Sequence, residues 1–394
     1  MKKISLLLLA LLLLMACEFK VNLNTNHSQK VSKIIDSIQA QMIPDKRDFV
    51  FEFDTQDKKD TVVIAGATNY PEIIKKINSI LDKEKILFQN KIQLLPFAKY
   101  ANKMGITRLS VANLRAKPKH SAELVTQTLM GMPLQILREK NGFYQVKTPE
   151  SYYAWIDGAG LEIMDKNDFN KWQSKEKVIV TYNYGQAFSE PKSNAQPVSD
   201  IVMNNVFVKL EENGDYIKVA YPDGRIAYIK MEKLLPLTEW KAANERYATP
   251  NDVIQLAKNY IGIPYLWGGS STKGIDCSGF SKSVYAQLGY LLPRDASQQV
   301  KIGKKIEITN DFKNLQPGDL LFFGSIKNAK EKITHVAIHI DKGRIIHATG
   351  EVKFESLNAK DADYNPDRRK SLLQVRRIFR EYPQKFAEIY SQKK

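Results

Sequence analysis

Cysteine and histidine are scarce in this 394-residue chain, which has two cysteines, Cys17 and Cys277, and five histidines. Cys17 closes an apolar N-terminal run, so it is an implausible disulfide partner for Cys277. A fold held together by several disulfides is therefore excluded. Cys277 is left as an unpaired thiol, and three of the five histidines cluster within residues 335–347.

Long apolar runs are scarce as well, and the notable one covers residues 4–16 after a basic start. Thirteen residues are too few to cross a bilayer comfortably but are typical of a signal peptide. The run ends in Leu-Met-Ala-Cys17, which resembles the bacterial lipobox. The resemblance implies cleavage before Cys17 and a lipid on it, and the alternative is a plain secretory signal. We expect residues 1–17 to direct an exported, membrane-anchored lipoprotein of the cell envelope.

Acidic residues are outnumbered, 43 against 59 basic ones, and the net charge is +16. A basic surface often binds nucleic acid, but export argues against that partner. Lipid headgroups and carboxylate-rich wall material are anionic partners outside the cytoplasm, and charge that only keeps the protein soluble is equally consistent. An exported free thiol is open to oxidation, which suggests that the chemistry of Cys277 is used.

The length favours two to four compact units. Residues 28–100 have the pattern of a small α/β unit, with helices over 31–42 and 71–81 and strands over 48–54 and 61–65. We find no chemistry in this unit. It is followed by more β-like sequence.

An internal repeat occupies the middle of the chain, with matching residues 73 positions apart. Pro118, Leu137, Val146 and Ile156 recur as Pro191, Leu210, Val219 and Ile229. Both copies contain short apolar runs broken by Asn-Gly, at Asn141 and Asn213, which predicts hairpins. Two small β-barrels are expected, over 104–165 and 175–236.

The first copy resembles the bacterial Src-homology-type barrel in four places. They are Val111-Ala-Asn-Leu-Arg115, Pro118, Gly142-Phe-Tyr-Gln-Val146 and Tyr153-Ala-Trp-Ile156. The resemblance implies a barrel that attaches an enzyme to wall polymer or shapes its substrate cleft. The charged stretch 237–246 lacks a β pattern and is the predicted linker to a last domain over 247–383.

This last domain begins with a helix signal, in which Thr249 caps, Pro250 takes the first position and Gly262 ends the helix. Cys277 stands before a second helical pattern. A thiol at a helix N-terminus loses its proton more readily, and such sites lower a cysteine pKa to roughly 3.5–7.5.

A predicted hairpin downstream supplies imidazoles for that thiol. Residues 334–340 and 345–348 alternate as two strands around a turn, which can hold His335 and His347 side by side. One ring would act as base and the other would orient it. Two alternatives remain, an inert buried thiol and a zinc site from Cys277, His335, His339 and His347.

Residues from about 250 to 380 resemble the NlpC-type cysteine peptidases, which have a papain-like α+β fold. The matching segments, in family order, are 265–269, 276–280, 317–323, 335–337 and 346–348. The resemblance implies Cys277 as nucleophile, His335 as general base and acid, and His347 as the orienting residue. It implies an oxyanion site from Tyr265 and the Cys277 N–H, and gives His339 no role.

The whole layout resembles the γ-D-glutamyl-L-diamino-acid endopeptidases, in which the first barrel closes the cleft and recognises a free N-terminal L-Ala. The resemblance implies these substrate-binding positions: Asp276, Ser278, Arg294, Asp295, Glu123 and Tyr153. A cationic amine needs an anionic, partly enclosed partner. Ala296 departs from the serine that is frequent in the family and puts one carboxylate contact in question.

We therefore expect a multidomain α+β protein with a small α/β unit, two SH3-like barrels and a papain-like domain. It is expected to be a monomeric enzyme without cofactor or metal. Its expected partners are peptidoglycan-derived peptides and, through Cys17, a membrane. Another amidase or acyl-transfer activity on the same thiol, or a non-catalytic wall-binding lipoprotein, are the alternatives.

Overall fold

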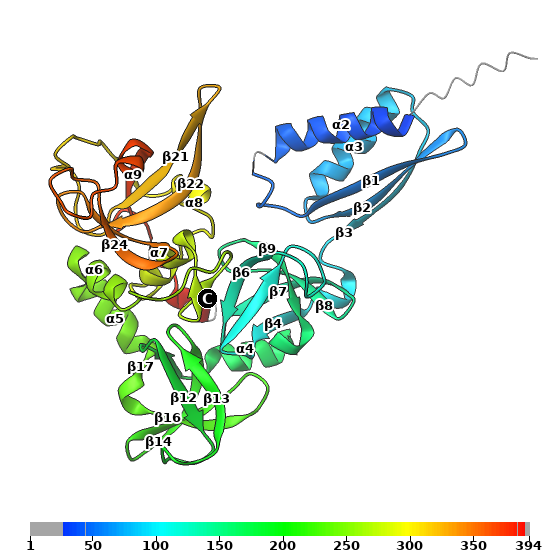
Figure 1. The fold of residues 1–394 in the computed structure, drawn as a ribbon. Coiled ribbons are helices and arrows are strands. Elements are labelled where there is room, and N and C mark those ends of the chain that lie inside the picture. Colours follow the sequence, from blue (N-terminus) through cyan, green and yellow to red (C-terminus); the bar gives the residue numbers. More distant parts are fainter. Residues whose placement is uncertain (1–26, 44, 384, 391–394) are drawn as a thin grey trace, which may run out of the picture. The chain divides into compact units, whose positions relative to one another are not determined.

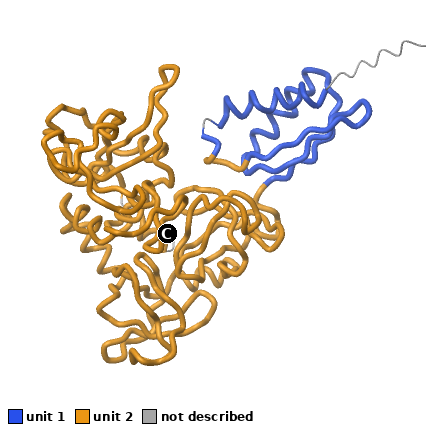
Figure 2. The backbone as a smooth tube through the Cα atoms, in the orientation of Figure 1, with its two compact units in different colours: residues 1–46, 51–94 blue, residues 47–50, 95–394 orange. Residues whose placement is uncertain are grey.

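The computed structural model describes residues 27–43, 45–383 and 385–390, which form two compact units (Figures 1 and 2). The first holds the described residues up to Lys46 together with Phe51–Leu94, and the second holds Arg47–Val50 and the chain from Leu95 onward. The predicted signal peptide and Cys17 lie outside the described residues. Within those residues, no helix has both the length and the apolarity to cross a bilayer.

The first unit is a three-stranded sheet with two helices. Its elements are α2 (His27–Met42), β1 (Phe51–Lys58), β2 (Thr61–Thr68), α3 (Pro71–Lys83) and β3 (Phe88–Leu94). β1 pairs antiparallel with β2, and α3 carries the chain to β3, which pairs parallel with β2. The apolar sides of the two helices are buried, at Val31, Ile35 and Ile38 in α2 and at Ile73, Ile77 and Leu81 in α3.

The predicted strand over 48–54 is wrong at both ends, because β1 runs from Phe51 to Lys58. The polar second half of β1 leads into a tight turn at Lys59, which has a φ of 53°. That turn pairs Lys58 with Thr61 and keeps the hairpin ladder intact. Backbone pairing therefore extends the strand beyond the alternating phenylalanines that signalled it.

Two seven-stranded barrels follow, with the same strand order. The first contains β4 (Lys103–Thr107), β5 (Val111–Arg115), β6 (Leu124–Leu129), β7 (Pro133–Lys140), β8 (Phe143–Lys147), β9 (Tyr153–Asp157) and β10 (Leu161–Asp165). The second contains β11 (Lys177–Val180), β12 (Tyr184–Phe188), β13 (Pro197–Val202), β14 (Val206–Asn213), β15 (Tyr216–Ala220), β16 (Ile226–Lys230) and β17 (Leu234–Pro236). Helix α4 (Lys166–Ser174) joins them.

The repeat seen in the sequence is a repeat of strands. The order β10-β4-β7-β8-β9-β5-β6 in the first barrel matches β17-β11-β14-β15-β16-β12-β13 in the second. The predicted hairpin turn at Asn141-Gly142 is confirmed, since both residues have positive φ, 54° and 76°. This is the backbone form that an Asn-Gly turn favours.

The predicted linker is a helix, α5 (Leu237–Tyr247), whose Leu237 and Trp240 are buried. Helix α6 (Pro250–Lys258) then begins with the expected cap, a reciprocal capping box between Thr249 and Asp252. It ends at Lys258, before the predicted stop. The chain continues through a turn to Gly262, which has a φ of 82°.

The last domain is a six-stranded sheet of order β20-β25-β21-β22-β23-β24 packed against helix α7 (Figure 1). Its remaining elements are β18 (Ser270–Ser271), β19 (Gly274–Ile275), α7 (Cys277–Ala286), α8 (Ala296–Gln299), β20 (Lys304–Ile306), β21 (Leu320–Lys327), β22 (Lys330–His339), β23 (Arg344–Thr349), β24 (Glu351–Ser356), α9 (Pro366–Lys370) and β25 (Leu372–Arg377). Short 3₁₀ turns cover Ala98–Tyr100, Gly158–Gly160, Met231–Lys233 and Ala387–Tyr390.

The core under this sheet positions the thiol helix. Phe280 and Val284 of α7 have no exposed surface, and they pack in one cluster with Phe322, Val336 and Ile346 from the sheet. Helix α7 therefore lies with its first residue, Cys277, beside β22. The predicted multidomain α+β fold, with two SH3-like barrels and a papain-like domain, is confirmed.

Candidate active site

Cys277 is the first residue of α7, as the sequence predicted. Asp276 caps the helix, and its Oδ1 accepts from the Gly279 N–H at 2.7 Å. Gly279 allows the helix to approach the preceding loop, since a Cβ there would lie 2.1 Å from the Gly269 carbonyl oxygen. Cys277 is thus held by a cap on one side and by a close backbone contact on the other.

The thiol of Cys277 is buried, with 7% of the residue exposed. Burial raises its pKa to about 11, and the negative charge of Asp276 adds to the rise. Backbone hydrogen bonds from Val336 and Ser278 act in the opposite direction. The expectation of a depressed pKa is therefore wrong, because loss of hydration outweighs the helix N-terminus. The resting sulfur is a protonated thiol.

The predicted pairing of the two imidazoles is confirmed. His335 on β22 and His347 on β23 lie with Nε2 and Nδ1 2.8 Å apart, and the rings meet edge to face. Burial lowers the pKa of His335 well below its usual value, and the positive charge of Arg368 lowers it further. Burial and Arg368 also lower the pKa of His347, to about 3. Both rings are neutral near pH 7.

His339, the third histidine of the cluster, faces a different environment. Its Nδ1 lies 3.0 Å from the Gln316 carbonyl oxygen, and its Nε2 accepts from the Gly343 N–H at 3.3 Å. Both ring nitrogens are thus used to fix turns of the backbone. Within the described ranges no group of three or more histidine, cysteine or acidic side chains is arranged to hold a metal.

A buried ion pair lies next to Cys277. Arg294 has 1% of its surface exposed and contacts both Asp276 oxygens, through Nη1 at 3.1 Å and Nη2 at 2.6 Å. Arg294 Nη1 also donates to Ser278 Oγ at 3.0 Å. Arg294 and Ser278 are thus engaged with Asp276, and their predicted contact with substrate stays a prediction. Both hold Asp276 in place, and Asp276 itself is 7% exposed.

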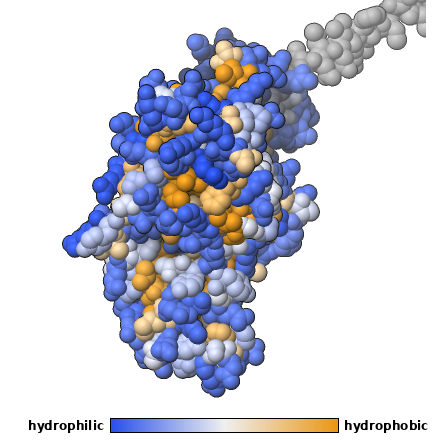
Figure 3. All heavy atoms as spheres, turned by 60° about the vertical axis from the view of Figure 1, so that its left-hand side comes forward, coloured by the Kyte–Doolittle hydropathy of each residue, from blue (hydrophilic) through white to orange (hydrophobic). Residues whose placement is uncertain are grey.

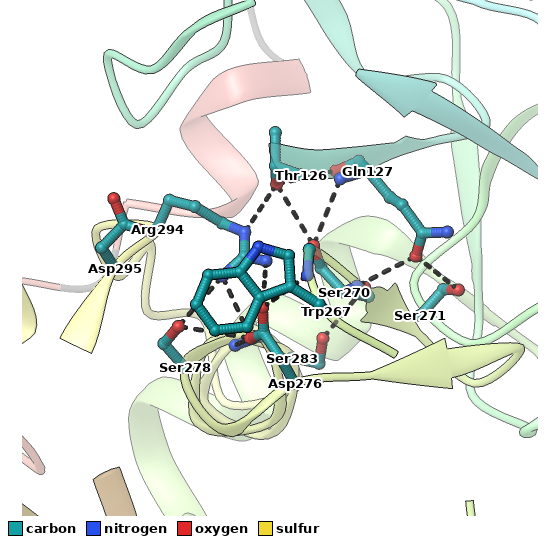
Figure 4. Close-up of polar contacts among 12 residues, drawn as sticks. Thr126, Gln127, Trp267, Ser270, Ser271, Asp276, Ser278, Ser283, Arg294 and Asp295 are labelled. Atoms are coloured by element: carbon teal, nitrogen blue, oxygen red, sulfur yellow. Dashed lines mark hydrogen bonds and ion pairs between the residues drawn. The ribbon is translucent and has the colours of Figure 1, made fainter. Parts of the chain in front are cut away.

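The first barrel is connected to this ion pair through strand β6 (Figure 4). Arg294 Nε donates to Thr126 Oγ1 at 2.9 Å. Gln127 Oε1 accepts from the Ser270 N–H and from Ser271 Oγ, both at 2.9 Å. Gly268 permits this contact, since a Cβ there would lie 2.2 Å from the Leu124 carbonyl oxygen. The barrel therefore borders the loop that leads into Cys277.

Apolar side chains gather in patches on a mostly hydrophilic surface (Figure 3). Trp267 is one of the exposed ones, at 65%, and its Nε1 donates to Glu123 Oε1 of the first barrel at 2.9 Å. This bond joins a predicted amine-binding carboxylate to the segment that precedes the nucleophile. The partner of Glu123 is neutral, whereas the charge of Asp276 is balanced by Arg294.

Tyr265 lies close enough to Cys277 for the sulfur to affect its pKa. Burial raises the pKa of Tyr265 to about 12, with further contributions from Cys277 and Asp276. Its hydroxyl is consequently protonated and can donate a hydrogen bond. Its backbone N–H donates to the Gly350 oxygen at 2.8 Å, which ties the segment to the end of β23.

Of the two adjacent tyrosines in the first barrel, Tyr152 is the one directed at the last domain. Burial raises its pKa, and a hydrogen bond to Asp295 contributes to the rise. Asp295 forms a capping box with Gln298 at the start of α8, the helix that holds Ala296. The predicted Tyr153 begins β9 instead, and the Lys147 ammonium lies 5.7 Å from its ring centre. Neighbouring positions at a strand end face opposite ways, and no pattern in the sequence indicates which of the two tyrosines faces the last domain.

Residues 262–367 match the NlpC/P60 family, and residues 110–162 match the bacterial SH3 domain. The chain is 30% identical over 278 residues to the dipeptidyl-peptidase 6 of Lysinibacillus sphaericus, covering 68% of this chain and 97% of that protein. It is 30% identical over 271 residues to the γ-D-glutamyl-L-lysine dipeptidyl-peptidase of Bacillus subtilis (strain 168), covering 65% and 81%.

A crystal structure of an NlpC/P60 family protein from Bacillus cereus ATCC 10987 has a similar fold. Its TM-score is 0.59 at 22% identity, with 71% of this chain and all of that chain covered. A papain-like domain with a thiol at a helix start and a bordering barrel defines a cysteine peptidase. The chain belongs to the NlpC/P60 family.

The raised thiol pKa predicts how Cys277 reacts. Only the thiolate is alkylated, so the rate with iodoacetamide should rise roughly tenfold per pH unit from about pH 6 to about pH 10. Peptide mapping by mass spectrometry follows Cys277 apart from Cys17, with glutathione as the reference thiol. A rate that is already level from about pH 6 would reveal a preformed thiolate and contradict this description.

Loss of Arg294 should destabilise the last domain. Arg294→Gln leaves the buried Asp276 carboxylate without its cation, which costs about 3–5 kcal/mol. Arg344→Gln is the matched control, because Arg344 and Asp363 form an exposed pair at 3.1 Å that contributes about 0–1 kcal/mol. Urea denaturation measures both. Equal effects of the two substitutions would refute the role given to the buried pair.

Proposed function

We propose that this cysteine peptidase hydrolyses the γ-D-glutamyl–L-diamino acid bond of cell-wall peptides that carry a free N-terminal L-Ala. The relatives support hydrolysis of cell-wall peptides in general. Two are named dipeptidyl-peptidases, and the name of one specifies the γ-D-glutamyl-L-lysine bond. The observation that carries the proposal is the placement of the first barrel. Its Glu123 contacts the loop that leads to Cys277.

The reaction begins with a neutral thiol and a neutral imidazole. Because His347 occupies Nε2 of His335, the nitrogen that remains for the Cys277 proton is Nδ1. The proton moves from Sγ to Nδ1 as the sulfur attacks the scissile carbonyl. The imidazolium then gives its proton to the departing amine of the diamino acid, which leaves an acyl-enzyme.

Water completes the cycle. Neutral His335 takes a proton from water as the oxygen attacks the thioester carbonyl, and returns it to the sulfur as the acyl group leaves. The protonated Tyr265 hydroxyl and the Cys277 N–H are the donors for the negative oxygen that develops in both steps. No further reactant is required.

Recognition of the substrate amine is assigned to Glu123. Its carboxylate is exposed and has a neutral indole as hydrogen-bond partner, so its charge is available to an ammonium group. Asp276 lies beside the nucleophile, but Arg294 already balances its charge. Asp276 therefore acts by holding the helix start, and Glu123 supplies the attraction for the free amine.

Residues 1–17 support an extension of this proposal to the location of the enzyme. A signal peptide that ends at a lipobox cysteine would place the protein on a membrane, through lipid on Cys17, with the enzyme on the outer side. We propose that it acts there as a lipid-anchored monomer. Labelling of cells with an alkyne-modified fatty acid tests this, and a Cys17→Ser variant should lose the label.

The amine assignment predicts a double-mutant cycle. Acetylating the amine of L-Ala-γ-D-Glu-diaminopimelate should lower kcat/KM about 10–100-fold, because a charge-assisted contact is lost. Glu123→Gln should lower kcat/KM for the free peptide by a similar factor, and acetylation should then have little further effect. Mass spectrometry of released diaminopimelate gives the rates.

The control is Glu162→Gln on strand β10 of the same barrel, which should leave both rates unchanged. Equal cleavage of free and acetylated peptide by the wild type would contradict recognition of the amine. That result would favour a broader amidase on the same thiol. No cleavage of either peptide would contradict the proposed bond specificity altogether.

A further inference from the structure

A polar cluster lies behind His347 and has no part in the reaction described above. Glu355 on β24 places Oε2 at 3.5 Å from His347 Nε2 and at 3.6 Å from Arg368 Nε. Its other oxygen, Oε1, accepts from Asn365 Nδ2 at 3.0 Å. Asn365 also caps α9, since its side chain accepts from the Arg368 N–H at 2.9 Å. The carboxylate is therefore held from two sides.

Three polar atoms of this cluster, two nitrogens and one carboxylate oxygen, lie close together. His347 Nε2, Glu355 Oε2 and Arg368 Nε are all buried, and none has a hydrogen-bond partner at ordinary distance among the described residues. His347 has no exposed surface. A buried polar atom without a hydrogen bond costs free energy. Buried polar atoms that lie this close together are therefore expected to interact with one another. Here the available acceptor for both nitrogens is the Glu355 carboxylate.

The direction of the imidazole pair depends on which nitrogens hold protons. For Nδ1 of His335 to accept the thiol proton, His335 must be protonated at Nε2 and must donate to His347 Nδ1 across the 2.8 Å contact. His347 must then hold its own proton at Nε2. In the opposite arrangement each ring would hold its proton on the other nitrogen. Nδ1 of His335 would then be protonated and could not accept the thiol proton.

We propose that Glu355 is a positioning residue that accepts from His347 Nε2–H and thereby sets both rings in the tautomer that catalysis requires. The inference rests on the proposed function, which assigns His335 as the base. The contacts run from Glu355 to His347 and from His347 to His335, which is the base proposed for Cys277. No covalent bond changes in Glu355 itself. An acceptor that binds the far nitrogen of a functional histidine is known to fix the tautomer and the orientation of its ring.

The surrounding cations explain why the role of Glu355 is orientation and not charging of the rings. Arg368 and Lys353 both lower the pKa of His347, and Arg368 also lowers that of His335. Arg368 is itself fixed against the site, 5.2 Å from the Phe323 ring centre, and Phe323 packs against His335. Glu355 partly balances this positive charge while it accepts from the neutral ring.

A purely structural role for Glu355 makes different predictions. In that case the carboxylate would only join β24 to α9 through Asn365 and Arg368. Removing it would loosen α9 but would leave the protonation sites of the rings as they are. The position of the ring protons therefore separates the two roles.

The experiment compares Glu355→Leu, which cannot accept a hydrogen bond from His347, with Glu355→Gln, whose amide oxygen can. We expect Glu355→Leu to lower kcat about 10–100-fold with KM within about twofold, and Glu355→Gln to lose less. Glu351→Gln, an exposed carboxylate on the same strand, should have no effect. Nitrogen-15 NMR of histidine-labelled full-length protein should show His347 protonated at Nε2 in the wild type and mixed tautomers in Glu355→Leu.

Because Glu355→Leu leaves Arg368 without its anion, the double variant with Arg368→Met serves if the single one does not fold. The inference is overturned if His347 keeps its Nε2 proton in the leucine variant that folds, or if kcat does not change. It is also overturned if wild-type His347 holds its proton at Nδ1. The NMR readout needs no substrate, so it still decides the role of Glu355 if the wild type fails to cleave the peptide.

Discussion

The buried ion pair between Asp276 and Arg294 is the contact around which the rest of the site is built. Asp276 caps α7, and Arg294 joins that cap to Ser278 and to Thr126 of the first barrel. A carboxylate taken out of water needs such a partner, and the partner in turn fixes where the helix can begin. The position of Cys277 and the position of the barrel are therefore set by one charged and polar cluster.

The second property of the site is that its thiol and imidazoles are buried away from water. Burial favours the uncharged forms of both the sulfur and the imidazoles, so the Cys277 thiol and the rings of His335 and His347 are all neutral at rest. In the proposed mechanism, charge develops only when the sulfur attacks the carbonyl, where the proposed oxyanion donors can stabilise it. In this arrangement the direction of proton transfer depends on ring tautomers, which makes the groups behind His347 relevant to catalysis.

The sequence was sufficient for those features that are local or repeated. Residues next to Cys277 signalled a helix start, and the alternating strands around residues 341–344 brought His335 and His347 together. The constant offset of the repeat predicted two barrels of one topology. The ends of β1 could not be read in this way, because its polar half is held only by pairing with β2.

Tertiary properties were beyond the sequence. The pKa of Cys277 depends on how completely the sheet and the loops bury it, and the local helix argument gave the wrong direction. Neither Glu355 nor Tyr152 belongs to a recognisable motif in the sequence. Only folding places Glu355 behind His347 and Tyr152 beside Asp295. Arg294 was identified, but its part as the buried partner of Asp276 follows from the packing of three segments distant in sequence.

Covalent chemistry on Cys277 is the central claim, and rapid-quench intact-mass spectrometry during turnover tests it most directly. With L-Ala-γ-D-Glu-diaminopimelate, the account predicts a transient increase in protein mass equal to the L-Ala-γ-D-Glu acyl group, mapped to Cys277. The Cys277→Ala variant should show neither adduct nor product. Product formation that persists in that variant would contradict the account.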